Sequence, residues 1–315
     1  CNVSCKSNQR VWIRVLCITH YTLHNLYALR CALHWIDWSI VGVFCLISLL
    51  LGTMLRHVAG KSLEAYFVSG RSLGWWLAGT SIAATAFSSD TPLLVTGMVR
   101  RRGIWGVWEV WALGISTMFA VFVFAKLWKR ANVMTEVELV ERRSSGRAAA
   151  FLRGFKAIYW GLLYNCLIIG VWPVTGMTKV LQETTGLGRE GAIVGCVLLG
   201  TIYTSLSGLW GVVLTDAFQF IVAMLGAVIL AGYAMHAVGG FGALSERLSD
   251  TSVLHVIPPG PADPGASVLS SPFGWFLGLI LIQWWAGKNT DGGGVIGQRM
   301  VSCKNERHAM LSVLW

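Results

Sequence analysis

Apolar residues fall in long runs with few or no charges, and each run is bounded by polar or basic segments. Each run approaches or exceeds the roughly 18 to 20 residues that span the hydrocarbon of a bilayer. The pattern predicts an all-α polytopic membrane protein with spans in the runs 38–55, 74–99, 104–125, 157–178, 191–215, 217–235 and 266–287.

Turn signals refine these boundaries. The sequence SLSG at 205–208 predicts a tight turn between helices at 191–206 and 209–235, since Gly and Ser supply turn geometry. A polar amphipathic segment at 134–153 precedes a helix at 155–179, and residues 239–268 predict a mostly irregular loop before a helix near 271. Residues 1–35 show no clear period or signal-peptide layout and are unassigned, as after a mis-called start.

Composition supports the membrane class. Hydrophobic residues make up 55% of the 315 residues and charged residues only 13%. The formal charge of +10 does not predict nucleic-acid binding, because the basic residues lie between apolar runs, as in membrane-protein loops. The distribution of Lys and Arg among the predicted loops favours a topology with the N-terminus on the outer side of the membrane. We find no nucleophile and base, and no metal spacing among the eight Cys, so we expect neither an enzyme nor a transition-metal site.

The run at 74–99 carries polar residues at its centre, in the sequence IAATAFSSDTPLLVTG at 82–97. Asp90 would be costly in a membrane unless it faces a cavity, a partner or an ion, and Pro92 removes a backbone donor. We predict that the helix unwinds here and frees carbonyl oxygens for a hard cation such as sodium. A packed polar kink without a ligand is the alternative.

A second interruption lies in the sequence QWWAGKNTDGGG at 283–294. Lys288, Asn289, Asp291 and three glycines replace the continuation of an apolar helix, as in the discontinuous helices of secondary transporters. A simple loop end is the alternative. Four predicted crossings separate the two interruptions, which places them as the first helices of two five-helix repeats.

Two further acids lie in or near predicted spans. Glu109 and Asp216 are functional candidates because burial of a charge in a membrane is costly. A solvated helix end is the alternative for Asp216. Most Trp residues lie near span ends, where interfacial anchoring is expected, although Trp284 or Trp285 could stack on a ligand.

Four stretches together resemble the sodium:solute symporter family, which includes bacterial proline and sugar symporters. They are FVSGRSLGWW at 67–76, the interrupted AATAFSSDTPLLVTG at 83–97, SLSGLWGVVLTDAFQF at 205–220 and QRMVSCKNERHA at 298–309. The resemblance covers about residues 36–315. It implies part of a LeuT-like fold, with five-plus-five inverted repeats, discontinuous first and sixth core helices and a leading extra helix.

The resemblance also implies a site and a coupling ion. Sodium would bind the carbonyl oxygens of Ala84 and Phe87, with Asp216 on its exit route, and no other cofactor is implied. Solute contacts would fall on Asp90, Thr91, Glu109, Gln283 and Asn289. The glycine triplet and Lys288 depart from the better-known sugar and proline branches, which leaves the solute open.

These implications lead to a leading hypothesis and an alternative. The first is sodium-driven symport of a small organic solute by alternating access, in the plasma (inner) membrane, with solute and lipid bilayer as the partners. Because the chain ends in the expected seventh core helix, the sodium-site hydroxyls of the eighth are absent, and we expect this piece alone not to transport. The alternative is a symporter-like sensor module of a signalling protein.

Overall fold

The fold was obtained as a computed structural model, which describes residues 35–88, 90–249, 252–261, 267–286 and 290–315. Helices and short turns make up the regular structure of these residues, apart from one isolated bridge between Leu73 and Cys303. Residues 1–34 of the unassigned segment 1–35 and the candidates Lys288 and Asn289 lie outside the described residues.

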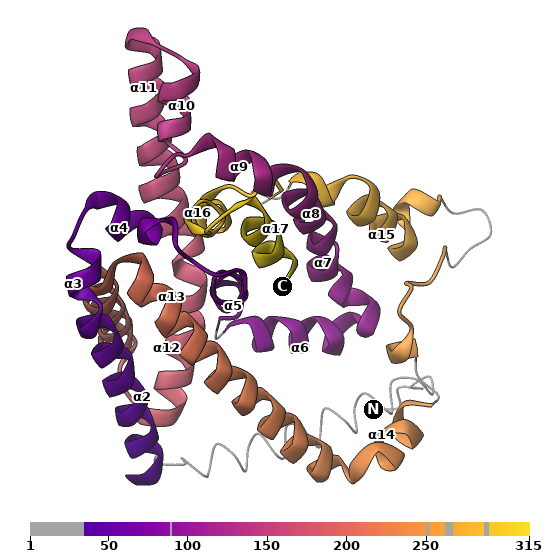
Figure 1. The fold of residues 1–315 in the computed structure, drawn as a ribbon. Coiled ribbons are helices and arrows are strands. Elements are labelled where there is room, and N and C mark those ends of the chain that lie inside the picture. The colour runs from indigo at the N-terminus through magenta and orange to yellow at the C-terminus, as the bar shows by residue number, and fades with distance from the viewer. Residues whose placement is uncertain (1–34, 89, 250–251, 262–266, 287–289) are drawn as a thin grey trace.

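The first half of the chain folds into short helices and three longer helical runs (Figure 1). Two π-helical stretches connect α-helices directly. Ala120–Phe124 (η3) lies between α8 and α9, and Ala157–Ile169 (η4) lies between α11 and α12, so neither pair of helices is separated by a long loop. The helices are α2 (Trp35–Met54), α3 (Arg56–Ala59), α4 (Leu63–Val68), α5 (Trp75–Ala86), α6 (Asp90–Arg102), α7 (Trp108–Trp111), α8 (Leu113–Phe119), η3 (Ala120–Phe124), α9 (Ala125–Ala131), α10 (Glu138–Arg143), α11 (Gly146–Lys156), η4 (Ala157–Ile169) and α12 (Val171–Thr185).

The second half begins with a 50-residue helical segment, α13. Gly208 interrupts it with φ of 57° and ψ of −171°, so the predicted turn at 205–208 is a kink at one glycine. The predicted irregular loop at 239–268 is wrong in part, because its first residues form α14. The helices are α13 (Arg189–Val238), α14 (Gly240–Leu248), α15 (Pro272–Leu281), η7 (Gln283–Ala286), α16 (Gly294–Ser302) and α17 (Glu306–Leu314).

Three of the described helices are long and apolar enough to cross a membrane: Trp35–Met54, Ile104–Ala131 and Ser207–Val238. The sequence predicted more spans. Each half of the two interrupted runs is too short to span alone, since α5 has 12 residues and α15 has 10. The interruptions therefore explain why the runs 74–99 and 266–287 are not among the three, whereas the predicted spans 157–178 and 191–215 are also not among them.

The core is built around α5, which packs against α13, α16 and α17 (Figure 1). Leu77 and Ala78 of α5 are buried with Val213 of α13 and Met300 of α16. A Cβ on Gly79 would lie 2.7 Å from the Ser312 carbonyl oxygen, so this glycine permits the close approach of α17. The interrupted helix α5–α6 therefore starts from the buried core.

Candidate functional site

The first predicted interruption is present. Helix α5 ends at Ala86, Phe87 is extended with φ of −99° and ψ of 91°, and α6 begins at Asp90. Pro92 does not sit at the break itself. It is the third residue of α6, where a backbone N–H has no partner within the helix, so its absence in proline costs no helical hydrogen bond. Proline therefore favours the start of α6 here, and the unwinding precedes it.

Hydrogen bonding at the break explains which carbonyls are released. In a continuous helix, Ala84 and Phe87 would accept from the N–H groups of Ser88 and Thr91, four residues on. Instead, the Ser88 N–H donates to Thr91 Oγ1 at 3.3 Å, and the Thr91 N–H donates to the Ser88 carbonyl at 3.1 Å. Among the described residues, the Ala84 carbonyl accepts one bond, at 3.1 Å from the Phe87 N–H, which is shared with Ala83. Both predicted sodium carbonyls have lost their regular helical donors.

Asp90 lies at the start of α6 and accepts a hydrogen bond from the Ser88 hydroxyl. It also touches α12, because a Cβ on Gly176 would lie 3.1 to 3.2 Å from the Cβ, Cα and N of Asp90. Such contacts are tighter than side chains normally tolerate, so glycine is needed for this approach. The interruption is thus held between α5 and α12.

Asp216 is enclosed in the protein and does not form a solvated helix end. Its Oδ2 accepts from the Ser81 hydroxyl at 2.5 Å and lies 3.4 Å from the Arg299 guanidinium. Arg299 Nε also donates to Ser81 Oγ at 3.2 Å. The side chains of Arg299 and Asp216 are 7% and 17% exposed. Because Ser81 lies one turn before Ala84 on α5, the structure brings Asp216 close to the first break.

The second interruption is also present. After α15 ends at Leu281, the short turn η7 and the residues to Gly293 separate it from α16. The glycine triplet has a steric reason: Gly292 and Gly294 have φ of 68° and 64°, and a Cβ on Gly293 would lie 3.0 Å from Asp291 Oδ1. The Trp128 indole N–H donates to the Asp291 carbonyl at 2.6 Å. Thus α9 fixes the turn.

The other predicted solute contacts lie elsewhere. Glu109 accepts from Arg102 at 3.0 Å, and the Arg102 guanidinium lies 4.9 Å from the centre of the Trp275 ring. This cluster connects α6, which follows the first break, with α15, which precedes the second. Gln283 is exposed in η7, and Trp284 stacks on Phe119 at 4.9 Å between ring centres. No recorded contact joins Glu109 to Gln283.

Two hydrogen bonds fix the beginning of α5. The Leu73 N–H donates to the Ser302 carbonyl at 3.0 Å, and the Trp75 N–H donates to His308 Nδ1 at 3.0 Å. Cys303, opposite Leu73, is fully buried, and burial raises the pKa of its thiol to about 11. The segment between α16 and α17 therefore holds α5 in place.

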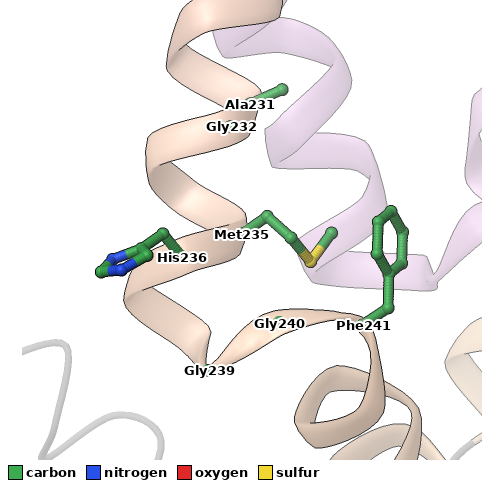
Figure 2. A pocket seen from close by; sticks show the side chains of 7 residues that line it. All are labelled: Ala231, Gly232, Met235, His236, Gly239, Gly240 and Phe241. Carbon is green, nitrogen blue, oxygen red and sulfur yellow. The ribbon is translucent and has the colours of Figure 1, made fainter.

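A hollow of about 630 Å³ lies at the bend between α13 and α14, away from these residues. Figure 2 shows the side chains of Met235 and Phe241 beside it, with His236 directed to the other side. Ala231, on its rim, follows Asp216 by 15 residues, or about 22 Å along a helix. Its lining is largely apolar, and it is not part of the candidate site.

Sequence reasoning missed several residues that build this region: Ser81, Trp128, Glu136, Arg299 and His308. Arg299 and His308 were visible in the QRMVSCKNERHA motif but received no role. The sequence did hold one signal for Arg299. Asp216 lies in an apolar run, and a buried carboxylate needs a cation or hydrogen bonds.

Comparison with known proteins yields one family. The sequence model of the sodium:solute symporter family matches residues 66–315. The sodium/glucose cotransporter 1 of Oryctolagus cuniculus is 29% identical over 212 residues, which is 67% of this chain and 31% of that protein. The sodium/myo-inositol cotransporter 2 of Mus musculus is 28% identical over 268 residues, or 79% and 37%. The chain thus spans less than half the length of these relatives, which are transporters and not enzymes.

A solved structure provides the fold comparison. It is a sodium-coupled sialic acid symporter in a substrate-bound outward-open state, and it aligns with 89% of this chain and 56% of that chain. The TM-score is 0.73 at 18% sequence identity. At this identity the likeness establishes the fold alone, and it confirms the predicted all-α transporter fold.

Proposed function

Because the chain belongs to the sodium:solute symporter family, we propose that it forms part of a symporter that moves a small organic solute together with sodium by alternating access. The family match includes both interrupted helices, α5–α6 and α15–α16. The observation that carries the proposal is the loss of regular helical donors from the carbonyls of Ala84 and Phe87.

Sodium binding would use oxygen atoms at the first break. Carbonyl oxygens suit a hard cation, and the residues present fit this role because local bonds within Ser88–Thr91 divert the competing N–H groups. Asp216 would lie on the route that sodium takes from this site. It contacts α5 through the Ser81 hydroxyl, one helical turn before Ala84. The Arg299 contact would then compete with sodium for the carboxylate.

The solute would contact the two breaks. Asp90, Thr91, Glu109, Gln283 and Asn289 are the candidate residues. The names of the matching proteins specify glucose, myo-inositol and sialic acid, so a polyhydroxylated solute is the class to test first. The plasma membrane is the proposed location.

A sodium-dependent thermal-shift screen of the complete gene product tests the proposal. Potassium at equal ionic strength is the control, and the panel contains sugars, polyols, amino acids and carboxylates. Ligands that bind the native state raise the unfolding temperature. We expect sodium to raise it, to increase the shift given by at least one solute, and to lose this effect in Asp216→Asn. Identical shifts in sodium and potassium across the panel would refute sodium coupling.

A further inference from the structure

The carboxylate of Glu136 caps a helix far along the chain. Glu136 lies between α9 and α10, and its Oε2 accepts the Gly294 N–H at 2.9 Å across 158 residues of sequence. Gly294 is the first residue of α16, and first-turn N–H groups have no partner inside a helix. Gly293, at the N-cap, has no side chain to accept them. Glu136 therefore supplies the missing acceptor and a favourable negative charge.

The other carboxylate oxygen connects this cap to a second element. Glu136 Oε1 lies 2.8 Å from Lys156 Nζ, and each side chain is 24% exposed. Lys156 is the last residue of α11, which continues directly into η4 and α12. One carboxylate thus joins the start of α16 to the helical run that begins with α11.

The surrounding turn is shaped to allow this contact. A Cβ on Gly293 would lie 3.4 Å from Glu136 Oε2, and Asp291 Oδ1 accepts the Gly293 N–H at 2.9 Å. The Trp128 indole holds the Asp291 carbonyl from α9. Together, Trp128 and Glu136 fix both ends of the turn Asp291–Gly294, which closes the second break.

We propose that Glu136 is a positioning residue for transport, which holds the start of α16 and the second break against the helical run beginning at α11. This inference rests on the proposed function, in which the second break lines the solute site. Glu136 acts through the backbone of α16, and Lys156 orients its carboxylate.

Hydrogen exchange of the complete protein tests the cap independently of transport. Glu136→Ala should speed exchange of the Gly294 amide roughly fivefold, the usual loss when a capping side chain is removed. Glu136→Gln should restore protection, since its amide oxygen still accepts, and Lys156→Met should retain most of it. Wild-type exchange in Glu136→Ala, or an equal increase in Lys156→Met, would overturn the cap.

Solute uptake by the same variants tests the role in transport. Glu136→Ala should raise the solute KM roughly tenfold with a smaller change in kcat, and Glu136→Gln should largely restore KM. Glu141→Ala is the matched control, because Glu141 pairs with Arg153 at 2.5 Å in the exposed α10–α11 hairpin. An unchanged KM in Glu136→Ala would overturn the role. A wild-type protein without transport would instead refute the proposed function, while the exchange result would still decide the cap.

Discussion

The carboxylate of Asp216 and the guanidinium of Arg299 lie 3.4 Å apart inside the protein, although 83 residues separate them in sequence. The Ser81 hydroxyl bonds to both, so the pair joins α5, α13 and α16. Loss of one partner from such a buried pair usually costs about 3 to 5 kcal/mol, because the other charge is left uncompensated. The pair thus couples one candidate sodium residue to the segment that follows the second break.

This coupling predicts a non-additive mutant cycle. Asp216→Asn and Arg299→Met should each lower the free energy of unfolding, since each leaves one buried charge without its partner. The double variant removes both charges and should be at least about 1 kcal/mol more stable than the sum of the single effects predicts. Thermal or denaturant unfolding in detergent measures this difference. Additive effects would mean that the two groups do not interact.

Thr91 provides a prediction about the first break. Its Oγ1 accepts the Ser88 N–H, which would otherwise bond to the Ala84 carbonyl. Thr91→Val removes this acceptor, so the apparent sodium affinity should fall by roughly fivefold, the equivalent of one net hydrogen bond of about 1 kcal/mol. Sodium titration of solute uptake or of the thermal shift measures the change.

Thr96→Val is the matched control for this variant. The Thr96 hydroxyl bonds only within α6, to the carbonyls of Pro92 and Leu93 among the recorded contacts. Its loss should leave sodium affinity unchanged. Equal sodium affinity in Thr91→Val and wild type would show that Thr91 does not release the carbonyl.

Gly176 predicts a steric effect on the same break. The new methyl group of Gly176→Ala would lie 3.1 to 3.2 Å from Asp90, so α12 or the break must shift. Stability should fall, whereas Gly195→Ala, which meets nothing within 4 Å, should gain up to about 1 kcal/mol from helix propensity. Unfolding temperatures of the two variants provide the measurement. Equal stabilisation of both would contradict the close packing of α12 on Asp90.

Both interruptions could be predicted from the sequence because their signals are local. Asp90, Pro92 and the glycines at 292–294 break an apolar run wherever the rest of the chain lies. The position of the first break differs from the prediction: Pro92 marks it in the sequence, but the extended residue is Phe87. The unwinding depends on bonds between Ser88 and Thr91, which no composition rule describes.

The partners of the candidate residues could not be predicted for a different reason. Asp216 meets Arg299, and Glu136 meets Gly294, only after helices distant in sequence pack together. Periodicity carries no information on such pairs. Helix α14 was also missed, because its glycines resemble loop composition, while an amphipathic helix still forms at 240–248.

Cys303 predicts a pH dependence of stability. Burial raises the pKa of its thiol from 9.0 to about 11, so the folded protein keeps its proton after the unfolded chain has lost it. The free energy of unfolding should therefore be unaffected by this group below pH 9 and should decrease from pH 9 towards pH 11. Cys303→Ala should remove this part of the decrease. Identical pH profiles of the two proteins over this window would contradict the raised pKa.

Solute uptake into proteoliposomes that contain the complete gene product tests sodium coupling most directly. Radiolabelled glucose, myo-inositol, sialic acid and an amino-acid mixture are supplied with an inward sodium gradient, with sodium at equilibrium, or with a potassium gradient. The account predicts that at least one solute accumulates transiently above equilibrium only with the sodium gradient, and that Asp216→Asn weakens this response. Equal accumulation of every transported solute under all three conditions would contradict it.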